Sequence, residues 1–115
     1  MRKLIPAGRA LALVLSSCAF FGIGADATVT VTNHYWHPAA GQEVVEYTVK
    51  NTGTLPLVMV QVRFKAICED GTSYQETWAS FDLDLKQSAD ETVWITTNGS
   101  PVVEIKVMEI QKSTY

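Results

Sequence analysis

Apolar and polar residues alternate with a period of two along most of the chain from residue 28 onward. In one such run, Val45, Tyr47 and Val49 alternate with polar residues. A longer run places these apolar side chains on one face: Val58, Val60, Val62, Phe64, Ala66 and Cys68. This alternation is typical of a strand with one buried face, whereas no segment here repeats with the helical period near 3.6. The pattern therefore predicts β-strands throughout this part of the chain.

Turn signals separate the alternating runs. Asp70-Gly71 and Asn98-Gly99 supply the positive φ angles that tight hairpin turns require. Strands are expected near residues 28–33, 43–51, 57–69, 72–79, 80–86, 91–97 and 102–111. Short strands with polar outer faces predict an all-β fold, specifically an antiparallel immunoglobulin-like β-sandwich of about seven strands. The expected buried side chains are Tyr47, Val60, Val62, Phe64, Leu83, Val93, Ile95 and Ile105.

The start of the chain has a different pattern. The basic residues Arg2, Lys3 and Arg9 precede an uncharged run that ends in Ala25-Asp26-Ala27. A basic region, a short apolar region and an A-x-A site are the three parts of a secretory signal peptide. We therefore expect a signal helix within residues 1–27 and cleavage after Ala27.

Cleavage there would leave one mature β-sandwich domain, residues 28–115. The uncharged run is shorter than the ~20 apolar residues that a spanning helix needs, so no membrane span is expected after processing. The expected location is periplasmic or secreted. A second processing site remains open, because Leu15-Ser16-Ser17-Cys18 resembles the lipobox of bacterial lipoproteins and would anchor the chain through an acylated Cys18.

Charge narrows the choice of partners. After cleavage at Ala27, six basic and eleven acidic residues would remain, for a formal net charge of −5. An acidic surface repels phosphate backbones, so nucleic-acid binding is not expected. It does suit a periplasmic inhibitor or immunity-type protein that masks a basic partner. The single cysteine of the mature part, Cys68, excludes an internal disulfide.

Three segments carry a family resemblance. They are residues 47–53 (YTVKNTG), residues 58–64 (VMVQVRF) and Glu69-Asp70-Gly71. Together they resemble the FxLYD-type domains of prokaryotic envelope proteins. The chain departs from that family at Ala89-Asp90-Glu91, where the family has proline, glycine and glutamate, and after Phe64. The resemblance implies an extracytoplasmic β-sandwich that serves as an accessory or binding module, and it implies no catalytic residues.

The stretch His34-Tyr35-Trp36-His37 contains both histidines of the chain and two large aromatic residues. It lies between two expected strands, so it is expected at one end of the sandwich. Exposed tryptophan and tyrosine are favoured at interfaces, which makes the four residues a candidate contact surface for another envelope or secreted protein. Copper or zinc binding through His34 and His37 is an alternative. Zinc needs three or four protein ligands, however, so no metal site and no cofactor are assigned.

No group of residues indicates catalysis. Cys68 lies on the apolar face of its strand beside Glu69 and Asp70, a setting that does not activate a thiol. Asp82 and Asp84 alternate with apolar residues, as on a solvated strand face. The sequence therefore favours a non-enzymatic binding or structural accessory module of the bacterial cell envelope.

Overall fold

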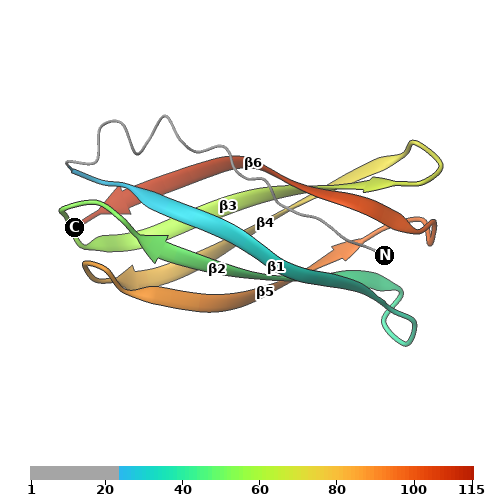
Figure 1. The fold of residues 1–115 in the computed structure, drawn as a ribbon, viewed down its shortest axis with the longest axis horizontal. Coiled ribbons are helices and arrows are strands. Elements are labelled where there is room, and N and C mark those ends of the chain that lie inside the picture. Colours follow the sequence, from blue (N-terminus) through green and yellow to red (C-terminus); the bar gives the residue numbers. More distant parts are fainter. Residues whose placement is uncertain (1–23) are drawn as a thin grey trace.

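The computed structural model describes residues 24–115 and contains six strands there and no helix (Figure 1). The strands are β1 (Ala27–His37), β2 (Gln42–Asn51), β3 (Leu57–Cys68), β4 (Ser73–Leu83), β5 (Ser88–Thr96) and β6 (Val102–Thr114). The expected signal helix and Cys18 lie outside the described residues. Nothing in residues 24–115 could cross a membrane as an apolar helix.

The strands form two three-stranded antiparallel sheets, with the orders β1-β2-β5 and β4-β3-β6. Figure 1 shows the two sheets as stacked layers, and the inter-sheet contacts place β5 beside β4 and β1 beside β6. The predicted all-β antiparallel class is therefore confirmed. Each sheet has one middle strand, β2 or β3, and two edge strands.

The number of strands differs from the expectation of about seven. The two strands expected at 72–79 and 80–86 form one strand, β4, which pairs with β3 from Ser73 opposite Ile67 to Leu83 opposite Leu57. The long partner strand keeps the two segments in one strand because it pairs with both of them, from Ser73 to Phe81 and again at Leu83. Strand β1 is also longer than expected and includes His34 to His37, which the sequence places in a loop.

The core lies between the sheets and is built mainly from the middle strands. The inward residues Tyr47 and Phe64 pack with ring centroids 4.7 Å apart and ring planes at 56°. Seven of the eight residues expected to be buried are buried; Ile105 is half-buried. Ile105 lies on the edge strand β6, where only one side has a neighbouring strand. Cys68 is buried and forms no disulfide within residues 24–115.

Two features of β4 explain the exposed apolar side chains on it and just after it. Trp78 pairs with Val62 on the inward face of β4, but its side chain is 49% exposed because β4 is an edge strand. Phe81, Leu83 and Leu85 occupy every second position and would share one face of a regular strand, but only Leu83 is buried. The strand ends at Leu83, and Asp82 has a φ angle of 56°, so the regular alternation of faces stops there.

Candidate functional site

The four residues His34 to His37 lie on β1, next to the hairpin that joins β1 to β2. Neighbouring residues of a strand face opposite sides, and residues directly opposite each other across a ladder share a side. His34 lies opposite Val45, a core residue, and therefore faces inward with Trp36. Tyr35 and His37 face outward. The stretch that the sequence presents as one surface is thus divided between two faces of the sheet.

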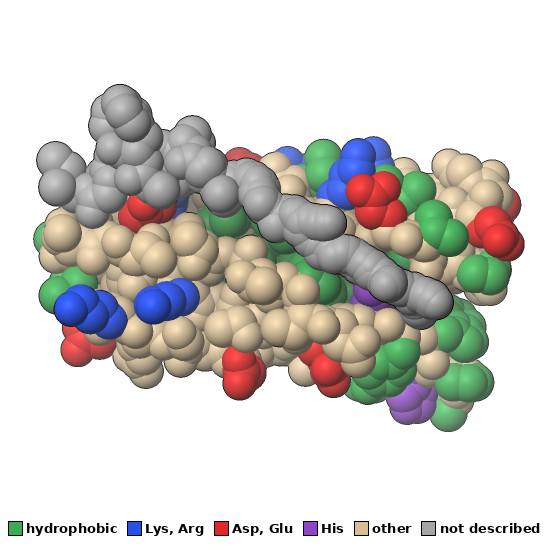
Figure 2. Space-filling model, viewed as in Figure 1, with side chains coloured by type: hydrophobic (Ala, Val, Ile, Leu, Met, Phe, Trp, Pro, Cys, Tyr) green, Lys and Arg blue, Asp and Glu red, His purple; other side chains and the backbone are tan. Residues whose placement is uncertain are grey.

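The outward residues join a group that spans all three strands. Tyr35 lies opposite Val44 of β2, and Val44 lies opposite Trp94 of β5. The ring of His37 packs against Trp94 at a centroid distance of 5.2 Å and an angle of 56°. We call Tyr35, His37, Val44 and Trp94 the outer aromatic cluster. In Figure 2, hydrophobic side chains gather around a histidine at the end of the molecule that contains the β1–β2 hairpin.

Burial within the outer aromatic cluster is uneven. Tyr35 is 42% exposed and Trp94 is 41% exposed. Val44 is only 1% exposed although it lies outside the core between the sheets. Cross-strand neighbours stand about 5 Å apart, so the two large side chains beside Val44 cover it. The result is an apolar surface in which two exposed aromatic side chains cover the buried Val44.

Polar contacts hold the margin of the cluster. The backbone N–H of Ala40 donates to Nδ1 of His37 at 3.2 Å, so the proton of the neutral ring is on Nε2. In the next row, Nε2 of Gln42 donates to Oγ1 of Thr96 at 3.0 Å. The first contact joins the hairpin to β1 and the second joins β2 to β5. Together they limit the movement of the strands that carry the aromatic rings.

His34 has a structural role, whereas Trp36 remains 39% exposed. Glu43 is 3% exposed, and its Oε2 lies 2.6 Å from Nδ1 of His34. A buried carboxyl group is costly unless it is hydrogen-bonded, and His34 supplies that bond. Trp36 lies opposite Glu43 across the ladder. The contact between His34 and Glu43 therefore satisfies the buried carboxyl group of Glu43 near the end of the core.

This division bears on the metal alternative. His34 and His37 face opposite sides of the sheet, so one ion could not be bound by both imidazoles without unpairing the end of β1. No group of three or more histidine, cysteine, aspartate or glutamate residues is arranged to hold a metal ion within residues 24–115. The geometry gives the copper or zinc alternative no support.

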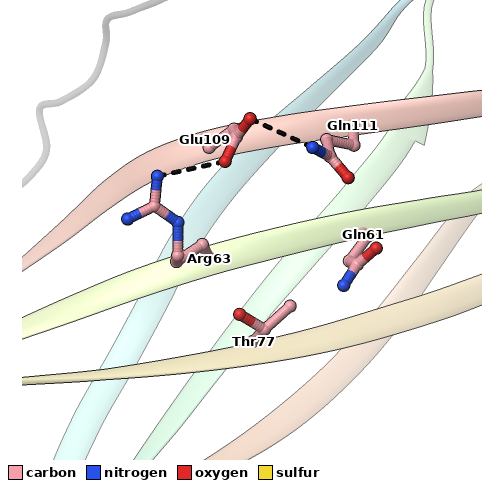
Figure 3. A pocket seen from close by; sticks show the side chains of 5 residues that line it. All are labelled: Gln61, Arg63, Thr77, Glu109 and Gln111. Carbon is pink, nitrogen blue, oxygen red and sulfur yellow. Dashed lines mark hydrogen bonds and ion pairs between the residues drawn. The ribbon is translucent and has the colours of Figure 1, made fainter.

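A shallow polar hollow of about 120 Å³ lies on the outer face of the other sheet (Figure 3). Arg63 donates from Nη2 to Glu109 at 3.0 Å, and Gln111 donates to the other Glu109 oxygen at 3.1 Å. The hydrogen bonds from these two residues, Arg63 first, lower the pKa of the Glu109 carboxyl below its usual value. The remaining lining residues are Gln61 and Thr77. These groups satisfy one another, and none of them is a nucleophile with an adjacent base.

Sequence reasoning found Tyr35 and His37 but missed Val44 and Trp94. The available signal was the alternation in β5: because Val93 and Ile95 were expected in the core, Trp94 had to face outward. The partner of Trp94 across the sheet could not be read in the same way, because strand order is not a local property.

Comparison of the chain with protein-family models, with curated proteins and with solved structures gave no match. The FxLYD-type resemblance therefore rests on the residues that carry it.

Proposed function

We propose that this chain is an exported, non-catalytic binding module of the bacterial cell envelope, and that it contacts another protein through the outer aromatic cluster. The proposal depends above all on the position of Tyr35 and Trp94, which stand exposed on either side of Val44 on one sheet face. The signal-peptide pattern supports export. The FxLYD-type resemblance supports an accessory role.

The physical case for a contact surface concerns ring size and rigidity. Tyrosine and tryptophan add a large contact area with only two side-chain torsions to immobilise, and they are enriched at interface hot spots. Here both rings stand on paired strands, so a partner would immobilise little further backbone. The Nε2–H of the half-buried His37 can add a hydrogen bond at the margin. Apolar surface on a strand face is costly in water, and binding would remove it.

The test compares Trp94→Ala and Tyr35→Ala with Phe81→Ala, a matched control on the other sheet. Phe81 is also aromatic and is 64% exposed, so its loss removes similar apolar surface elsewhere. Each variant would be used to capture partners from envelope extract, and affinity for the captured partner would then be titrated. Removal of a hot-spot ring costs at least ~2 kcal/mol, which is about 30-fold in Kd.

The expected result is loss of capture for Trp94→Ala and Tyr35→Ala and retention for Phe81→Ala. Melting temperatures should show that all three variants remain folded, since the replaced rings are exposed. Equal capture by all three variants would place the contact elsewhere. A strongly basic partner that binds equally well to all of them would favour the inhibitor or immunity-type alternative, in which charge dominates the contact.

A further inference from the structure

The residues just before β1 belong to the folded domain. The carbonyl of Gly24 accepts a hydrogen bond from the Thr54 N–H at 2.9 Å, and the Asp26 carbonyl accepts one from the Thr52 N–H at 3.2 Å. The Gly24 N–H in turn donates to Oγ1 of Thr54 at 2.7 Å. These bonds continue the pairing of β1 with β2, which begins at Ala27 opposite Asn51.

The same segment is also buried. Asp26 and Ala27 are each 3% exposed, and Ala25 packs against the core. Oδ1 of Asp26 accepts a hydrogen bond from the Ala27 N–H at 2.9 Å. A terminus that served only as a processing site would have no reason to bury Asp26 and Ala27 and to half-bury Ala25.

The backbone of residues 24–26 leaves no space for a side chain at Gly53. A Cβ atom at Gly53 would lie 2.1 Å from the Gly24 carbonyl oxygen and 2.7 Å from the Asp26 nitrogen. Both are backbone atoms that cannot rotate away. The φ angle of Gly53 does not lie in the left-handed region, so its own conformation does not require glycine. The close approach of residues 24–26 is therefore the reason for glycine at position 53.

Cleavage after Ala27 would remove every one of these contacts. The amides of Thr52 and Thr54 would lose their partners, and the core would lose Ala25 and Ala27. Signal peptidases act on chains before they fold, so burial would not prevent the cut; the cost would appear afterwards, in the stability of the shortened domain.

We propose that the exported protein retains Gly24–Ala27, so that the processed peptide bond lies on the N-terminal side of Gly24. Ala25-Asp26-Ala27 is then the first part of the domain and not the peptidase site. The step itself is hydrolysis of one peptide bond by water, which leaves a carboxylate on the signal and a new amino group on the domain. The bond before Cys18 at the lipobox satisfies this condition. The inference rests on the proposed export.

The first test is the N-terminus of the exported form, measured by intact mass and terminal sequencing after expression of the full chain in a bacterial host. Any terminus at or before Gly24 supports the proposal, whether Cys18 carries acyl groups or not. A folded exported protein that begins at Thr28 overturns it. An uncut chain in the cytoplasm would defeat the proposed export and, with it, this inference.

The second test is Gly53→Ala, introduced into the full chain and measured in the protein as it accumulates. With Gly24–Ala27 present, the added methyl group must displace the segment, and the melting midpoint should fall by at least about 5 °C. Without the segment the methyl group meets no such obstacle. Thr54→Val, with Thr54→Ser as its control, gives a milder version: only the valine removes the oxygen that accepts from Gly24. Unchanged midpoints in both Gly53→Ala and Thr54→Val overturn the proposal.

Discussion

Asn51, the last residue of β2, connects three parts of the backbone through its buried side chain. Its Nδ2 donates to the carbonyl of Leu55 at 2.9 Å and to the carbonyl of Leu83 at 3.0 Å. Its Oδ1 accepts from the Gly53 N–H at 3.0 Å. The Asn51 side chain is fully buried, so the protein itself must supply the hydrogen-bond partners of its amide group. Asn51→Asp keeps the shape of the side chain but replaces the donor with an oxygen.

The cost of this substitution can be estimated from the bonds. Two hydrogen bonds are lost, and each carbonyl then faces an oxygen. An unsatisfied buried polar group costs about 1–3 kcal/mol. An unpaired buried charge costs about 3–5 kcal/mol where a partner has been removed. We therefore expect Asn51→Asp to lower the free energy of unfolding by about 3–5 kcal/mol at neutral pH, a large part of the ~5–15 kcal/mol of a typical domain.

Urea denaturation followed by circular dichroism would measure this loss. Asn33→Asp is the matched control, because Asn33 is exposed on β1 and undergoes the same change in charge. Its effect should stay within about 0.5 kcal/mol. The loss at position 51 should shrink in acid, because a protonated carboxyl regains one donor. Equal effects at positions 33 and 51 would refute the role assigned to the Asn51 side chain.

Two further predictions concern the core. Phe64→Ala should lower the free energy of unfolding by about 3–5 kcal/mol, because Phe64 is fully buried against Tyr47. The control Phe81→Ala should lower it by less than about 1 kcal/mol, because Phe81 is exposed. Equal losses in the two variants would contradict the assigned core. Burial, and then the negative charge of Glu91, raises the pKa of Tyr47 from 10.0 to about 12, so the protein should lose stability as the pH rises from 10 to 12. The hydroxyls of Tyr47 and Ser80 are buried without a well-formed hydrogen bond in the described part of the chain. Tyr47→Phe should therefore change the free energy of unfolding little at pH 7 and should abolish the loss of stability between pH 10 and 12. If that loss persists in Tyr47→Phe, groups other than Tyr47 cause it.

The alternation of residues was enough to predict most of the strands and most of the core. Val60, Val62 and Phe64 repeat at every second position, and the chain must turn them to one side whenever it is extended. That rule is local, so it held for β2, for β5 and for β3 from Val60 onward without knowledge of their neighbours. At the start of β3 the register shifts between Leu57 and Met59, so Leu57 is buried where Val58 was expected to share the core face. The rule also failed at the end of β4, where Phe81 and Leu83 are two positions apart but only Leu83 is buried, because the positive φ angle of Asp82 interrupts the extended strand between them.

Burial at the edges and composition of the site depended on long-range pairing. Ile105 is half-buried and Trp78 is exposed because their strands lie at sheet edges, which no local pattern reveals. The sequence grouped His34 to His37 because they are adjacent, and the strand then separated them because adjacent side chains face opposite ways. Tyr35 and Trp94 are 59 positions apart in the chain and meet across Val44 only because β2 is the middle strand between β1 and β5. The alternation of side chains is a property of each strand alone, whereas the order of strands is decided by how the whole chain packs its two sheets.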